Sequence, residues 1–116
     1  MNLNDYTKQV HEANQQWWHN PRTGEKLNRN FGEMIALCHS ELSEALEGHR
    51  KDLQDDKLPH YKMIDVELID AVIRIFDLLG SRGVDAERIY QEKMMYNAVR
   101  ADHKAENRLQ PGGKAY

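Results

Sequence analysis

The sequence predicts an all-α protein: a four-helix protomer with an antiparallel central helix pair, pooled into a dimer or tetramer helical bundle. Residue types favoured in helices (Ala, Leu, Glu, Lys, Arg, Gln and Met) supply 57 of the 116 residues, whereas the strand-favouring Val, Ile and Thr supply 13. Apolar residues also recur at steps of three and four along four segments, which turn formers separate. A chain of this length is expected to form one domain, residues 1–116, with a modest core, so subunits that share a core would gain stability.

The first helix is expected over 4–18, and the loop that follows it contains Pro21 and Gly24. Its apolar positions keep helical spacing: Leu3, Tyr6, Val10, Ala13 and Trp17. The second helix is expected over 31–53, because the same spacing continues there and a polar break precedes Pro59.

The third helix is expected over 63–79, ending at Gly80, because glycine commonly follows the last helical turn. Polar residues form only a narrow stripe on this helix: Glu67, Asp70, Arg74 and Asp77. One neighbouring helix cannot cover so broad an apolar arc. We therefore expect the third helix to be buried on several sides, in part across a subunit boundary.

The fourth helix is expected over 86–104, with Asp85 as its N-cap. Three of its residues, spaced by four and three, share one face and are candidates for substrate binding: Lys93, Asn97 and Arg100. The two cations would complement phosphate charge, and the alternative is a solvent-facing basic stripe. The last residues, 110–116, have no periodic pattern, and the segment 105–116 is expected to be a flexible tail.

Four carboxylates are predicted to converge across the turn between the second and third helices. The second helix carries Glu41 and Glu44, three residues apart, and the third helix carries the second pair, Glu67 and Asp70. The residue pairs 41/70 and 44/67 are both centred on position 55.5, which lies inside the turn. Residues equidistant from the turn of an antiparallel hairpin face each other, so Glu41 is expected opposite Asp70. By the same reasoning Glu44 is expected opposite Glu67.

Such a cluster beside apolar packing requires protons or cations, because two like charges ~4 Å apart repel by about 4 kcal/mol at an effective dielectric near 20. A donor set of oxygen atoms alone, without His or Cys, favours Mg²⁺, with Mn²⁺ as a substitute, over zinc. The sequence therefore predicts a metal site suited to holding nucleotide phosphates, with these ligands: Glu41, Glu44, Glu67 and Asp70. The alternative is a set of structural carboxylates that pair with Arg74 and nearby lysines.

The acidic pattern resembles the signature of the MazG-like nucleotide pyrophosphohydrolases, members of the all-α NTP pyrophosphatase superfamily: Glu41-x-x-Glu44, a linker, then Glu67-x-x-Asp70. The polar face of the fourth helix is similar to a Lys, Asn and basic triplet that many members use near the phosphates. The resemblance covers about residues 31–100, and the tail 111–116 is similar to the Gly-Gly-Lys endings of small phage-type members.

This resemblance implies Mg²⁺-dependent hydrolysis of a nucleoside triphosphate between its α and β phosphates, giving a monophosphate and pyrophosphate, by a homodimer or a dimer of dimers. Glu41 or Glu44 is the expected catalytic residue, which orients or deprotonates the attacking water. A dUTP-selective or phosphoribosyl-ATP-selective hydrolase is an alternative within the superfamily. Outside it, the alternative is a non-catalytic helical dimer that binds a protein partner or a nucleotide.

Two adjacent tryptophans are further candidates for substrate binding. Trp17 and Trp18 point ~100° apart on a helix, so both cannot face the core. One of them is expected to stack on a nucleotide base. The structural alternative places Trp17 in the core and Trp18 in a subunit interface.

Charge and composition exclude several other classes of protein. With 16 Lys and Arg against 19 Asp and Glu, the formal charge is −3, and no long basic stretch could coat a nucleic-acid polymer. The single cysteine, Cys38, cannot form an internal disulfide, and the N-terminus lacks the pattern of an export signal, so a cytoplasmic location is expected. No apolar stretch reaches the ~20 residues of a membrane span.

Overall fold

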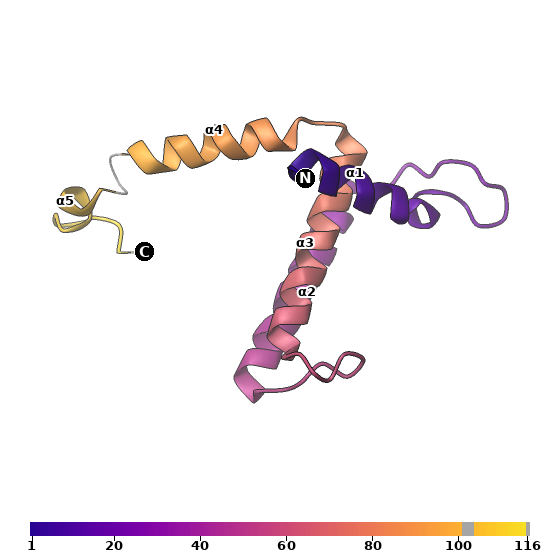
Figure 1. Cartoon of the computed structure of the whole chain (residues 1–116), viewed down its shortest axis with the longest axis horizontal. Helices are drawn as coiled ribbons and strands as arrows, with labels where there is room; N and C mark the ends of the chain where they lie inside the picture. The colour runs from indigo at the N-terminus through magenta and orange to yellow at the C-terminus, as the bar shows by residue number, and fades with distance from the viewer. Residues whose placement is uncertain (101–103, 116) are drawn as a thin grey trace. The chain divides into compact units, whose positions relative to one another are not determined.

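The computed structural model describes residues 1–100 and 104–115, and its regular structure there is helical, with two isolated β-bridges and no strand (Figure 1). The elements in chain order are α1 (Leu3–Ala13), the 3₁₀ turn η1 (Gln15–Trp18), α2 (Phe31–Lys51), α3 (Met63–Arg82), α4 (Ala86–Val99) and α5 (Ala105–Arg108). The predicted all-α class with four main helices is confirmed. The contacts form two compact units, 1–84 and 85–116, and the single domain expected from chain length stays a prediction.

The helices α2 and α3 lie side by side and antiparallel, as the sequence predicts. Their register is visible at Gly48, where an added Cβ would lie 2.8 Å from the Cγ of Met63 and 3.1 Å from the backbone nitrogen of Ile64. Positions 48 and 63 are equidistant from 55.5, the predicted centre of the turn. Close packing at this glycine therefore sets which residues of the two helices face each other.

The turn between α2 and α3 is held by its own polar groups. The buried carboxylate of Asp55 accepts hydrogen bonds from the backbone N–H groups of Lys57 (3.1 Å) and Leu58 (2.7 Å). The N–H of Met63 donates to the carbonyl of Leu53 at 3.0 Å. These bonds satisfy the backbone of a short irregular segment, so the two helices are joined in a defined register.

The predicted end of α3 at Gly80 is wrong, because the helix continues to Arg82 and ends at Gly83, whose φ of 65° is left-handed. Gly80 instead provides the contact with α1. An added Cβ there would collide with the carbonyl oxygen of Thr7 and lie 2.6 Å from the Cβ of His11. The missing side chain lets α1 approach the backbone of α3, which accounts for a glycine inside a helix.

The N-terminal helix is also shorter than predicted, because α1 ends at Ala13 and a separate 3₁₀ turn follows. The N–H of Asn14 bonds to the carbonyls of both Val10 and His11 (3.0 and 3.2 Å), and the side chain of Gln15 caps the His11 carbonyl at 2.9 Å. These bonds tighten the last turn and redirect the chain. The two tryptophans thus occupy a tight turn rather than a continuous α-helix.

The other predicted ends differ by a few residues. The helix α2 ends at Lys51, two residues early, because Asp52 adopts a left-handed conformation with φ of 49°. Asp85 caps α4 through the backbone N–H of Arg88 at 3.1 Å, as predicted. That helix ends at Val99 rather than residue 104, and residues 101–103 of the prediction lie outside the described part of the chain. The short helix α5 forms within the segment expected to be a tail, and flexibility of 105–116 stays a prediction.

The core of the first unit is small, and α3 is not buried on several sides in the single chain. The buried apolar residues of this unit are Trp18, Met34, Cys38, Ala45 and Ala71. On α3, Leu68 and Ile69 are 43% and 57% exposed, and Ile75 is 41% exposed. Burial of α3 on several sides is therefore not found within the first unit, where α1 and α2 are the helices that contact it among the described residues. Burial across a subunit boundary stays a prediction. Among the described residues, no helix is long and apolar enough to cross a membrane.

Candidate metal centre

Three of the four carboxylates predicted to converge lie together between α2 and α3. One oxygen each of Glu41, Glu67 and Asp70 can be chosen so that all three atoms lie within 4.8 Å of one another, and all three residues are half-buried. Two properties of the sequence produce this geometry: Glu67 and Asp70 are neighbours on one helical face, and the antiparallel register brings Glu41 opposite them. The convergence is as predicted for these three, and their role as metal ligands stays a prediction.

Glu44, the fourth predicted ligand, is exposed and does not belong to the group within 4.8 Å. It lies one turn further along α2, near enough for its charge and side-chain oxygens to raise the pKa of Glu67. The predicted pairing of Glu44 with Glu67 is therefore present as an electrostatic interaction rather than as close packing. Glu44 borders the cluster on its solvent side.

Within the cluster, Glu67 is the carboxyl group whose pKa is raised to the highest value. Burial raises its pKa to about 8, helped by hydrogen bonding with Glu41 and Glu44 and by the negative charges of Glu44 and Asp70. Its Oε2 atom is buried and has no hydrogen-bond partner among the residues that the structure describes. Burial, followed by the charge of Glu41, also raises the pKa of Asp70. A buried carboxylate oxygen without a donor is costly, and a cation or a proton is the group that would satisfy it.

Glu41 already forms an ion pair with Arg74. This pairing is the one expected if the acids were structural carboxylates rather than metal ligands. The Nε of Arg74 donates to Oε1 of Glu41 at 2.8 Å, and the Glu41 side chain is 12% exposed against 43% for the Arg74 side chain. Burial alone would raise the pKa of Glu41, but the hydrogen bonds from Arg74 and Glu67 and the charge of Arg74 lower it. The cluster therefore has one acid that is ionised and paired and one, Glu67, that resists ionisation.

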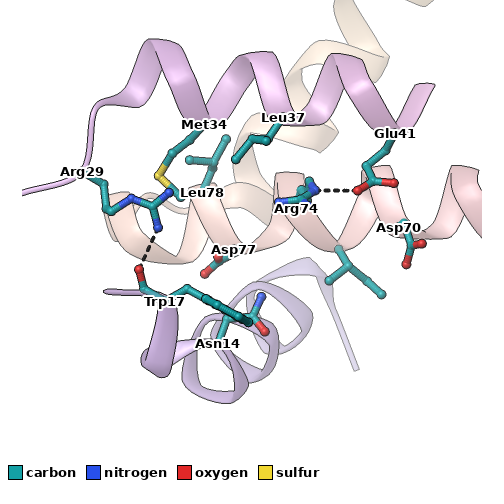
Figure 2. Close-up of a pocket in the computed structure, with 11 residues that line it drawn as sticks. Asn14, Trp17, Arg29, Met34, Leu37, Glu41, Asp70, Arg74, Asp77 and Leu78 are labelled. Atoms are coloured by element: carbon teal, nitrogen blue, oxygen red, sulfur yellow. Dashed lines mark hydrogen bonds and ion pairs between the residues drawn. The ribbon is translucent and has the colours of Figure 1, made fainter. Parts of the chain in front are cut away.

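Two of the three carboxylates, Glu41 and Asp70, line one end of a cavity of about 440 Å³ between η1, α2 and α3 (Figure 2). At this end it is lined by Glu41, Asp70 and Arg74, and at the other by Asn14, Trp17 and Arg29. The remaining lining residues are Met34, Leu37, Ile73, Asp77 and Leu78. A cleft of this size, whose wall mixes apolar side chains with charged and polar groups, is large enough for a small-molecule ligand.

The two tryptophans have different surroundings, and the structural alternative is wrong: Trp18 and not Trp17 lies in the core. Trp18 is the core residue, 4% exposed, and its Nε1 donates to both oxygens of the Asp77 carboxylate at 3.0 and 3.1 Å. The Nδ1 of His11 lies 2.8 Å from the same carboxylate. Trp17 is 60% exposed and lines the cavity, so of the two it is the one with a face available to a ligand.

Sequence reasoning missed Asn14 and Arg29, which shape the far end of the cavity. Arg29 donates from Nη1 to the carbonyl of Trp17 at 2.7 Å and so ties the loop to the 3₁₀ turn (Figure 2). Neither residue belongs to a motif or a periodic face. Because their positions depend on the fold of η1 and the loop, no local signal could have identified them.

The predicted phosphate-binding residues of the fourth helix lie in the second unit. The Nζ of Lys93 and the Cζ of Arg100 lie 5.0 and 5.5 Å from the ring centroid of Tyr96, as cation–π contacts. The Oδ1 atom of Asn97 is buried and has no hydrogen-bond partner. Contact of these residues with a substrate stays a prediction.

Comparison of the chain with protein-family models, with curated proteins and with solved structures finds no match.

Proposed function

We propose that the protein is a Mg²⁺-dependent nucleoside triphosphate pyrophosphohydrolase, with Mn²⁺ as a substitute, that converts (d)NTP to (d)NMP and pyrophosphate. The observation that supports this most is the convergence of Glu41, Glu67 and Asp70, two of which, Glu41 and Asp70, line one end of a cavity of about 440 Å³. The donor set is oxygen only, which suits Mg²⁺, and the unpartnered Oε2 of Glu67 supplies a ligand atom that no protein group uses. The resemblance of the acidic pattern to the MazG-like enzymes supplies the reaction class.

In the proposed reaction a water oxygen bonds to the α phosphorus and the α–β phosphoanhydride bond breaks. The bridging oxygen leaves with the pyrophosphate, and the water proton passes to a carboxylate. Glu44 is better placed than Glu41 to accept that proton, because Glu41 already accepts a hydrogen bond from Arg74. Bound Mg²⁺ would supply charge stabilisation of the phosphate oxygens.

The proposal also assigns roles to the exposed Trp17, to residues of the fourth helix and to the exposed apolar side chains of α3. The exposed indole of Trp17 would stack on the base. Lys93, Asn97 and Arg100 stay candidates for substrate binding, as the family resemblance implies. Exposed apolar side chains on α3, including Ile69 at 57%, support association into a homodimer or homotetramer, since such faces are normally covered.

A pyrophosphate-release assay over the eight common (d)NTPs and phosphoribosyl-ATP, with and without Mg²⁺, tests the function and distinguishes selective relatives. We expect Mg²⁺-dependent release, reduced at least 100-fold in Glu44→Gln and in Asp70→Asn. Glu47→Gln is the matched control, because Glu47 lies on the same helix, is exposed and pairs with Lys51 at 2.7 Å. Absence of release across the panel, or full activity in both site variants, would refute the enzyme.

A non-catalytic helical dimer that binds a partner or a nucleotide is the second candidate. The Arg74–Glu41 pair favours it, because this pair neutralises one carboxylate without any metal. The two proposals differ in the response of thermal unfolding to divalent cation, since a ligand that binds only the folded form raises Tm. A metal-independent Tm, together with a stabilising Glu67→Ala substitution, would select the binding protein.

A further inference from the structure

The ion pair between Arg74 and Glu41 places a protein cation on the acidic cluster. Arg74 lies one helical turn beyond Asp70 on α3, and its Nε lies 2.8 Å from Oε1 of Glu41. Both side chains line the cavity, and the guanidinium points toward the Glu41 carboxylate (Figure 2). A divalent ion at the cluster would share Glu41 with this guanidinium, and the two positive charges would repel.

The two members of the pair differ in how easily they can move. Glu41 is 12% exposed and is held among Glu67 and Asp70, whereas the Arg74 side chain is 43% exposed and borders the open cavity. Arginine has a long stem with several rotatable bonds, so its head can leave while the carboxylate stays. Separation of the pair would therefore move Arg74 into the cavity.

We propose that Arg74 is an exchangeable counterion: a divalent cation displaces it from Glu41, and the released guanidinium then binds the phosphate oxygens of the ligand in the cavity. This inference rests on the proposed function, because it requires the metal site. The planar guanidinium suits the proposed contact with the ligand, since it can bind phosphate through two parallel hydrogen bonds. Metal and phosphate binding are then coupled through one side chain, and each favours the other.

Titration of Tm with Mn²⁺ tests the exchange on the full chain without any need for activity. Arg74→Gln removes the competing charge, so we expect its half-saturating Mn²⁺ concentration to fall about fivefold to tenfold below the wild-type value. Arg74→Lys retains the charge and should return the midpoint to within about twofold of wild type. Arg82→Gln is the matched control, because it makes the same charge change at the end of the same helix; it should leave the midpoint unchanged.

Steady-state kinetics at saturating Mg²⁺ tests whether the released guanidinium of Arg74 binds the substrate phosphates. We expect KM for the best nucleotide of the panel to rise at least fivefold in Arg74→Gln, with little change in Arg82→Gln. Tighter metal binding combined with weaker substrate binding is a pair of opposite effects that loss of folding cannot produce.

The outcomes separate this inference from the proposed function. A wild-type Mn²⁺ shift whose midpoint is the same or higher in Arg74→Gln overturns the exchange and leaves the metal site standing. A lowered midpoint in a protein that releases no pyrophosphate supports the displacement step and refutes the enzyme. Absence of a Mn²⁺ shift in wild type and in Arg74→Gln overturns both the exchange and the metal site.

Discussion

Replacing Glu67 with Gln is expected to remove a pH dependence from the stability of the metal-free protein. The pKa of this carboxyl is about 8 in the fold, mainly because of burial, against an ordinary value of 4.5. The folded chain thus holds the proton more tightly than the unfolded chain. Stability associated with this proton is fully present below pH 4.5 and is lost as the pH rises through 8.

The size of the effect follows from these two values. At pH 7 a carboxyl with this pKa is about 90% protonated in the folded chain but ionised in the unfolded chain, so wild type loses stability with rising pH. Gln is neutral in both states and should leave the metal-free protein more stable than wild type at pH 7. Between pH 5.5 and 7.5 a single retained proton changes the free energy of unfolding by at most about 1.4 kcal/mol per pH unit. Glu67 is only half-buried, so solvent screening reduces this, and we expect a loss of about 1 to 2 kcal/mol across the interval.

Urea unfolding in EDTA at pH 5.5, 6.5 and 7.5 measures this loss. The difference between wild type and Glu67→Gln measures the contribution of this carboxyl together with that of the acids coupled to it. Glu33→Gln, an exposed substitution in the first turn of α2, should follow the wild-type curve. Parallel curves for wild type and Glu67→Gln would refute the idea that the cluster holds a proton on this residue.

Two further predictions concern the packing around the site. Gly80→Ala should destabilise the fold by about 1–3 kcal/mol in urea unfolding, because its Cβ would collide with the carbonyl of Thr7; unchanged stability would mean that α1 does not pack there. Trp18→Phe should cost about 1.5–3 kcal/mol, because it leaves the buried carboxylate of Asp77 without its indole donor. The exposed Trp17→Phe should stay within about 0.5 kcal/mol of wild type, and equal losses in the two tryptophan variants would contradict the buried hydrogen bond.

The register of the central hairpin was predictable because it depends on two local quantities. Helical spacing located α2 and α3, and the position of the turn set which of their residues are equidistant from it. The close contact of Gly48 with Met63 fits the predicted centre. Convergence of Glu41 with Asp70 follows from that register alone, so three of the four acids could be placed from sequence.

Interactions between segments far apart in the sequence could not be predicted from local patterns. Gly80 has the sequence signature of a helix end, yet its role is to admit α1, which lies more than sixty positions earlier in the chain. The choice between Trp17 and Trp18 was similarly open, because both occupy one turn and only the location of Asp77 decides which is buried. The 3₁₀ turn at 15–18 altered the expected direction of both side chains.

The sequence by itself determined that the protein is helical, where its central helices pair, and that acids from both helices meet. These properties follow from periodicity and turn position, which are short-range. The tertiary structure alone decided that Arg74 forms an ion pair with Glu41 and that a cavity extends from Glu41 and Asp70 to Trp17. It also decided that, among the described residues, an oxygen of Glu67 is buried without a hydrogen-bond partner. Those features arise where separate helices exclude water from particular atoms, and burial of that kind depends on every neighbouring element at once.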